Sequence, residues 1–128
     1  MNLILDTHSI LWFALDDPLL SAKAIAAIEG DENEVYISPA SYWEIAIKVC
    51  IGKYKLDTPF EDFWNQAIRD GEFEILPIGI PHARAVSQLP LIHRDPFDRM
   101  LVAQALCENL TVVSNDSLLD QYGIGRIW

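Results

Sequence analysis

Leu3-Ile4-Leu5-Asp6, at residues 3–6, is a run of three apolar residues that ends on a carboxylate. A run this short and wholly apolar is typical of a parallel strand that is buried on both faces. A helical pattern follows it, with apolar residues at Ile10, Leu11 and Phe13 before the helix-breaking Pro18. A buried strand followed by a helix is the first half of a β-α-β unit, so this stretch predicts an α/β fold with a parallel sheet.

The alternation of strand and helix continues along the chain. Further strands are predicted at residues 35–37, 73–76 and 110–113, with a final edge strand at 125–128. Helices are predicted over residues 20–29, 38–50, 59–69, 81–88 and 95–108, with a short helix near 117–121. The 128 residues match the usual domain size of about 100–150. We expect one domain over residues 1–128, with a central, mostly parallel sheet of four to five strands and helices on both faces.

Composition places the chain among cytoplasmic globular proteins. The 51% of hydrophobic residues excludes a disordered chain. No apolar run approaches the roughly 20 residues that span a bilayer, and no basic segment of a signal peptide precedes Leu3. Cys50 and Cys107 lie in separate apolar helical patterns and are interpreted as reduced, buried residues. The histidines lack the spacing of zinc ligands.

The charge balance argues against a protein that grips nucleic acid through a basic surface. The chain has 19 acidic and 9 basic side chains, for a net charge of -10. A protein that neutralises phosphates is expected to be basic. Much of the acidic excess lies in residues 29–34 and 57–74, but other carboxylates follow the predicted strands.

Four acidic residues occur where an open parallel sheet forms its sites, beyond the carboxyl ends of the strands. Asp6 follows the first strand, and Asp116 follows the strand at 110–113. Glu44 lies in the second turn of the helix after 35–37, and Asp98 lies at the start of the helix that leads to 110–113. We therefore expect the four carboxylates to meet at one edge of the sheet.

Each of these acids also has a purely structural interpretation. Asp6 and Asp116 can cap helices, Glu44 can pair with Lys48 one turn on, and Asp98 can lie at the third position of a helix. Four like charges at close range nevertheless need a counter-charge. Mg²⁺ and Mn²⁺ prefer carboxylate ligands, and one or two such ions can activate water and stabilise a leaving oxygen in phosphoryl-ester chemistry.

Four motifs spread over nearly the whole chain resemble those of a known family. They are Leu5-Asp6-Thr7-His8; Trp43-Glu44-Ile45 with Lys48 and Gly52-Lys53 downstream; His93-Arg94-Asp95-Pro96-Phe97-Asp98-Arg99-Met100-Leu101 with Ala103-Gln104-Ala105; and Ser114-Asn115-Asp116. The family is that of the PIN-domain ribonucleases, specifically the VapC-type toxins of type II toxin–antitoxin systems. Ser114 stands where threonine is commoner in the family, and the hydroxyl is retained.

The resemblance implies a PIN-like, three-layer α/β/α fold and a Mg²⁺- or Mn²⁺-dependent endoribonuclease. Asp6, Glu44, Asp98 and Asp116 would be the catalytic and metal-binding residues, with Ser114 as an auxiliary. The resemblance also implies a toxin that cleaves RNA and inhibits translation until a cognate, VapB-like antitoxin neutralises it by lying in a groove that obstructs the site. A homodimer and a toxin–antitoxin hetero-oligomer are expected by the same resemblance. Asp95 belongs to the third motif but is interpreted as an N-cap.

Basic and aromatic residues near the motifs have two interpretations each. Some of five basic residues near the motifs are hypothesised to contact RNA phosphates: Lys48, Lys53, Lys55, Arg94 and Arg99. The alternative is ordinary pairing, such as Arg99 with Asp95. The aromatic residues of the early helix and of residues 59–69 either pack in the core or line an exposed groove for an antitoxin helix. They are Trp12, Phe13, Phe60, Phe63 and Trp64.

Two functions of other classes compete with the nuclease. The first is a non-catalytic PIN-fold module that binds a partner and helps to regulate an operon; the presence of all four acids argues against it. The second is a metal-dependent phosphatase on a related α/β scaffold. The Asp6-Thr7-His8 turn lacks the second aspartate that haloacid-dehalogenase-type phosphatases carry two residues after the nucleophile.

Overall fold

The computed structural model describes residues 1–128 and contains one five-stranded sheet. The strand order is β3-β2-β1-β4-β5, and every pair of neighbours is parallel. The predicted sheet is therefore confirmed, with five strands and no antiparallel member. The strands are β1 (Asn2–Leu5), β2 (Glu34–Ile37), β3 (Glu74–Ile75), β4 (Thr111–Val113) and β5 (Arg126–Ile127).

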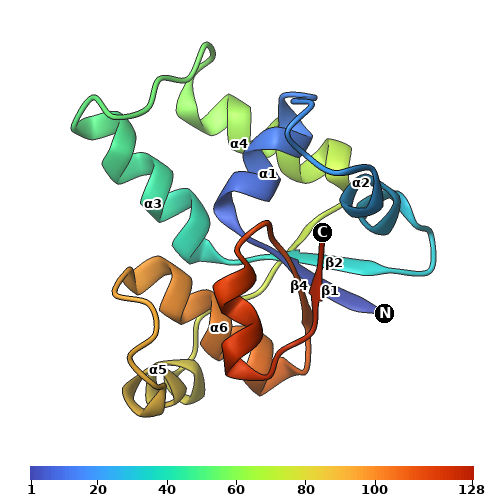
Figure 1. The fold of residues 1–128 in the computed structure, drawn as a ribbon. Coiled ribbons are helices and arrows are strands. Elements are labelled where there is room, and N and C mark those ends of the chain that lie inside the picture. The colour runs from blue at the N-terminus through green and yellow to red at the C-terminus, as the bar shows by residue number, and fades with distance from the viewer.

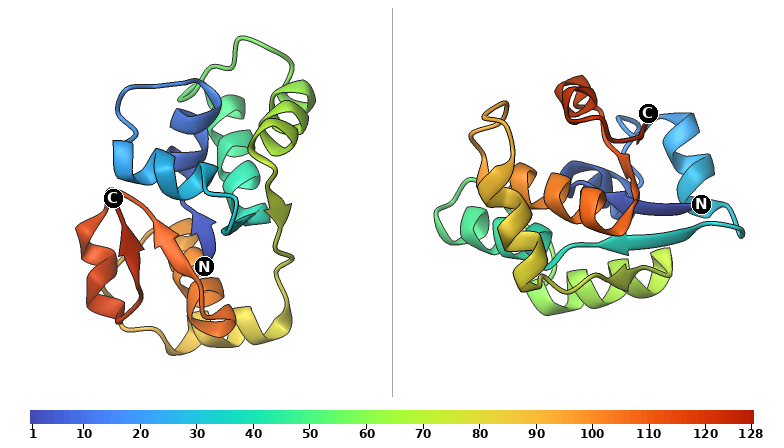
Figure 2. Two further views of the ribbon diagram at one scale, coloured as in Figure 1. Left: turned by 90° about the vertical axis from the view of Figure 1, so that its right-hand side faces the viewer. Right: turned by 90° about the horizontal axis from the view of Figure 1, so that it is seen from below.

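Helices cover both faces of this sheet. They are α1 (Thr7–Ala14), α2 (Ala22–Glu29), α3 (Pro39–Cys50), α4 (Phe60–Gly71), α5 (Ile80–Gln88), α6 (Pro96–Glu108) and the 3₁₀ helix η1 (Ser117–Tyr122). Figure 1 shows α1 and α4 above the strands and α5 and α6 below them. The same order of layers is seen after a quarter turn in the left view of Figure 2. The α/β/α arrangement matches the expectation from the sequence.

The central strand β1 explains why two helical layers are needed. Leu3 and Leu5 point to one face and belong to the larger core cluster, whereas Ile4 points to the other face and packs with Val102 and Val112. All three β1 residues are fully buried. Successive residues of a strand face opposite sides, so a strand that is apolar at every position requires cover on both.

Two side chains expected inside the protein lie on its surface. Cys50 and Cys107 are free thiols and both are exposed, at or near the ends of α3 and α6. The expectation that they are buried was wrong, because the apolar pattern near each continues on the outward side of its helix. No helix in the structure is both long and apolar enough to cross a membrane.

We predict that Ile4→Ala lowers the free energy of unfolding by about 2–5 kcal/mol, because it leaves a cavity between β1 and α6. The matched control is Ile80→Ala, since Ile80 is 86% exposed and its truncation should change stability by less than about 0.5 kcal/mol. Urea denaturation measures both values. Equal losses for the two variants would contradict the assigned core.

Candidate functional site

Asp6 lies directly beyond β1 and is held by two donors. Its Oδ1 accepts a hydrogen bond from the backbone N–H of Ser9 at 2.8 Å, so Asp6 is the N-cap of α1. Its Oδ2 accepts one from the hydroxyl of Ser114 at 2.5 Å. Ser114 is fully buried, and its Oγ also accepts from the backbone N–H of Asp116 at 3.0 Å. Ser114 thus ties the end of β1 to the loop after β4.

Asp116 follows β4 and is held on both carboxylate oxygens. Its Oδ1 caps η1 by accepting from the backbone N–H of Leu118 at 3.0 Å. Its Oδ2 lies 2.6 Å from Nε2 of His93. Asp6 and Asp116 line one small surface depression together with His8, Trp12 and Asn115, which places the ends of β1 and β4 at a common site.

Glu44 reaches this region from α3 and is buried. The hydroxyl of Thr7, next to Asp6 in the chain, donates to its Oε1 at 2.7 Å. The ammonium group of Lys48 lies 2.8 Å from its Oε2. The i,i+4 pair proposed as a structural alternative is therefore formed, and Thr7 links Glu44 to the end of β1.

Asp98 lies in the first turn of α6, where Asp95 is the N-cap. The pKa of Asp98 is raised to about 6, mainly by burial and then by the negative charge of Asp95, while His93 lowers it. The charges of Glu44 and Asp116 also raise it. Asp98 therefore lies within electrostatic reach of carboxylates from α3 and from the loop after β4.

The side chains of this site offer the oxygen ligands that a hard divalent cation prefers. In this structure, however, the carboxylates do not surround a single point. Asp6, Glu44, Asp98 and Asp116 offer only oxygen ligands, and their mutual repulsion at Asp98 is the kind that a cation relieves. No group of three His, Cys, Asp or Glu side chains lies close enough together to hold a metal ion. Binding by all four acids would therefore require some of these side chains to change rotamer, while a carboxylate oxygen that accepts a protein hydrogen bond keeps a second lone pair for a metal ion.

The basic residues predicted to contact RNA fall into two groups. Lys53, Lys55 and Arg94 are exposed and form no ion pair. Lys48 is bonded to Glu44. The structural alternative, an ion pair between Arg99 and Asp95, is not formed. The guanidinium of Arg99 instead holds the segment between α5 and α6. It donates hydrogen bonds to the carbonyl oxygens of Val86, Leu89, Pro90 and His93.

Three further side chains shape the site without having been singled out from the sequence. Thr7 bonds Glu44, His93 contacts Asp116, and the hydroxyl of Tyr122 lies 2.8 Å from Nδ1 of His93. Thr7 lies in the first of the four motifs and His93 in the third, so their proximity to the acids in sequence could have identified them. Tyr122 is 29 residues from His93 and carries no local signal.

The raised pKa of Asp98 predicts that this carboxylate destabilises the metal-free protein at neutral pH. Because the folded protein favours the protonated form, stability should fall as the pH rises from about 4 to about 6. Asp98→Asn removes this loss, so in EDTA its melting temperature should exceed that of the wild type at pH 7.5 and match it near pH 3.

Asp120→Asn is the control of opposite sign, because a hydrogen bond from Arg126 lowers the pKa of Asp120. Its melting temperature should fall slightly relative to the wild type at neutral pH. A lower melting temperature for Asp98→Asn at pH 7.5 would contradict the account of charge crowding at Asp98.

Solved structures of similar fold cover almost the whole chain. VapBC2 from Rickettsia felis bound to a DNA fragment from their promoter has a TM-score of 0.69 at 16% identity, over 98% of this chain and 97% of that chain. VapBC-1 from nontypeable Haemophilus influenzae has a TM-score of 0.67 at 15% identity, over 98% of this chain and 96% of that chain. FitAcB from Neisseria gonorrhoeae has a TM-score of 0.59 at 19% identity, over 97% of this chain and 95% of that chain. At these identities the similarity establishes the fold.

No relative among curated proteins matches the sequence. The family model of the PIN domain does, over residues 3–125. PIN domains are generally nucleases that use divalent metal ions. With nearly every residue inside the match, the chain belongs to the PIN domain family.

Proposed function

We propose that this PIN domain is a metal-dependent endoribonuclease toxin of the VapC type, which cleaves RNA, inhibits translation and is neutralised by a cognate antitoxin. The observation that carries the proposal is that Asp6 and Asp116, from the ends of β1 and β4, line one surface depression, and that Thr7 links Glu44 to the end of β1. The carboxyl edge of a parallel sheet is where such folds form their sites, and carboxylate oxygens are the ligands that a hard divalent cation prefers. Membership of a family of nucleases supports the same reaction class.

Asp6, Glu44, Asp98 and Asp116 are the residues that would hold Mg²⁺ or Mn²⁺. When bound, such an ion acts as a Lewis acid on a phosphate oxygen and lowers the pKa of water. The protein's own contribution is to orient the four acids. Ser114 holds Asp6 against the loop after β4, which keeps the carboxylates at the ends of β1 and β4 in a fixed relation.

RNA binding is assigned to the free basic groups beside the site. Lys53 and Arg94 are exposed and unpaired, so they are available to contact phosphates. Lys48 is held at the site by Glu44 and would meet RNA only near the acids. A net charge of -10 implies weak binding of RNA away from this local site.

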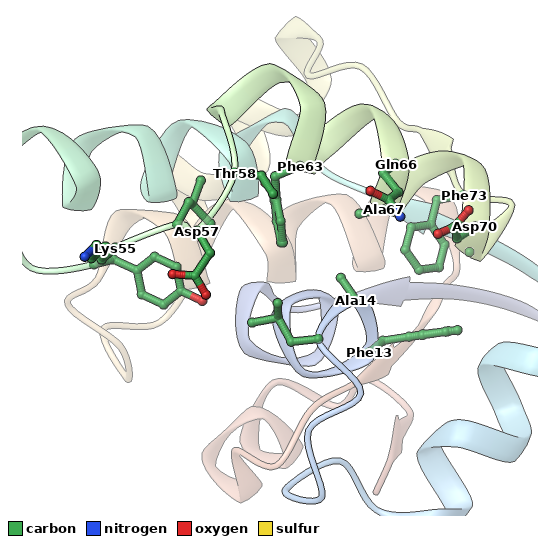
Figure 3. Close-up of a pocket in the computed structure, with 14 residues that line it drawn as sticks. Phe13, Ala14, Lys55, Asp57, Thr58, Phe63, Gln66, Ala67, Asp70 and Phe73 are labelled. Carbon is green, nitrogen blue, oxygen red and sulfur yellow. The ribbon is translucent and has the colours of Figure 1, made fainter.

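A groove between α1 and α4 supplies a place for an antitoxin. Figure 3 shows this groove, with Phe13 and Ala14 on one side and Phe63, Ala67 and Phe73 among the residues on the other. Its cavity volume is about 280 Å³. The apolar lining fits one face of an amphipathic helix, which is a common mode of peptide recognition.

The lining of this groove contains two carboxylates, Asp57 and Asp70, and one ammonium group, Lys55, so its charge is negative on balance. The two carboxylates favour a segment with basic residues beside its apolar ones. We assign the groove to the C-terminal segment of a VapB-like antitoxin. The solved structures of similar fold include VapBC complexes and FitAcB, in keeping with a partner of this kind. A homodimer and a larger toxin–antitoxin assembly belong to the same proposal.

The nuclease proposal predicts that the purified protein cleaves RNA with Mg²⁺ or Mn²⁺ and not in EDTA. Asp6→Asn and Asp116→Asn should each lower the rate at least about 100-fold, because each removes an anionic ligand. Asp31→Asn, at an exposed acid in the loop before β2, is the control and should retain full activity. Inducing each form in cells should arrest growth for the wild type and the control alone.

Full cleavage by Asp6→Asn, or cleavage that persists in EDTA, would contradict the metal-dependent mechanism. Hydrolysis of a generic phosphate ester without cleavage of RNA would favour the phosphatase instead. A wild type that binds its antitoxin but cleaves neither substrate would favour the non-catalytic module.

The assignment of RNA-binding residues predicts that Lys53→Glu and Arg94→Glu raise KM for RNA with little change in kcat, since they weaken phosphate contacts away from the reacting bond. Lys23→Glu in α2 is the control of equal charge change. KM values unchanged in both test variants would remove Lys53 and Arg94 from the RNA-binding surface.

A further inference from the structure

His93 and Tyr122 form a hydrogen-bonded pair behind Asp116 that the proposed function does not use. Nε2 of His93 lies 2.6 Å from Oδ2 of Asp116, and Nδ1 lies 2.8 Å from the hydroxyl of Tyr122. The two rings stack with centroids 5.4 Å apart and an interplanar angle of 24°. The His93 side chain is only 8% exposed, so its orientation is set by these partners.

The hydrogen-bond donors of this group determine which nitrogen of a neutral His93 carries the proton. The backbone N–H of His93 donates to the hydroxyl of Tyr122 at 3.0 Å, which leaves the phenol proton free to be donated. An ionised carboxylate only accepts, so Nε2 must donate to Asp116. Nδ1 then accepts from the hydroxyl of Tyr122. Tyr122 thus holds His93 in the Nε2–H form.

Both oxygens of Asp116 are consequently restrained by different elements. Oδ2 accepts from His93, and Oδ1 accepts from the backbone N–H of Leu118. The Asp116 side chain is 38% exposed, and without the imidazole only the bond to Leu118 would restrain its carboxylate. Partners that orient a ligating group raise metal affinity because less freedom is lost on binding.

We propose that His93, set in its Nε2–H form by Tyr122, is a positioning residue that aims the carboxylate of Asp116 at the metal ion. The inference rests on the proposed metal site and adds two residues that act through Asp116. It differs from a purely structural role, in which the His93–Tyr122 pair would only anchor η1 to the segment before α6.

The protein contains a matched control for this arrangement. His82 is also buried, its Nδ1 accepts from the backbone N–H of Gly79 at 2.9 Å, and its Nε2 lies 3.1 Å from a carboxylate oxygen of Glu108. Glu108 is the last residue of α6, ten positions after Asp98, or about 15 Å along the helix. The same kind of bond therefore occurs away from the proposed metal site.

The dissociation constant for Mn²⁺, measured by calorimetry, tests the proposal without relying on activity. His93→Leu should weaken Mn²⁺ binding by about 10–100-fold. His93→Gln keeps an amide N–H near the position of Nε2 and should rescue affinity to within about threefold. Tyr122→Phe removes the partner of Nδ1 and should weaken binding by an intermediate factor, and His82→Leu should leave it unchanged.

Nitrogen NMR of His93 gives a second readout that does not depend on metal. In the neutral form of His93 the wild type should carry the ring proton on Nε2, and Tyr122→Phe should shift the resonance of Nδ1 toward that of an unbonded nitrogen. If His93→Leu fails to fold, His93→Gln and Tyr122→Phe still decide the outcome.

Wild-type Mn²⁺ affinity in Tyr122→Phe, together with wild-type affinity in His93→Leu where that variant folds, would overturn the positioning role alone. An equal loss of affinity in His82→Leu would do the same. Absence of Mn²⁺ binding by the wild type would overturn the proposed function together with it.

Discussion

Burial of β1 on both faces is the constraint on which the rest of the structure depends. Leu3 and Leu5 require the helical layer that contains α1 and α4, and Ile4 requires the layer that contains α6. The three buried residues of β1 are followed directly by Asp6, which is half-buried. The parallel pairing of β1 with β4 brings Asp116 to the same edge, and the position of the site follows from the hydrophobic core.

The carboxylates at this edge are balanced individually by protein donors. Ser114 bonds Asp6, Thr7 and Lys48 bond Glu44, and His93 bonds Asp116. Asp98 makes no such bond, and its raised pKa reflects burial beside like charges. The protein donors offset part of the repulsion among these carboxylates in the absence of a cation. Asp98 has no such donor, so a bound cation would still be favourable there. Local crowding of carboxylates, and not the net charge of the chain, determines whether this edge attracts a cation.

Much of the fold was predictable because it depends on local periodicity and on residues that end helices. Each predicted strand and helix appears within a few residues of its expected bounds, from β1 to the short edge strand β5. The structure also brings Asp6 and Asp116 together as strand topology predicts. Side-chain partners over long sequence distances were not predictable. Tyr122 meets His93 through tertiary packing, and Arg99 binds backbone carbonyls that only the folded segment presents. Cys50 and Cys107 show that apolar neighbours in sequence do not determine which helix side is buried.

A crystal structure of the protein soaked in Mn²⁺ tests the central claim most directly, because anomalous scattering locates the ion independently of any model of the site. The account predicts an anomalous peak at the carboxyl edge of β1 and β4, coordinated by carboxylates from the set Asp6, Glu44, Asp98 and Asp116. A peak only at other acids, such as those of residues 29–34, or no peak at this edge at saturating Mn²⁺, would contradict it.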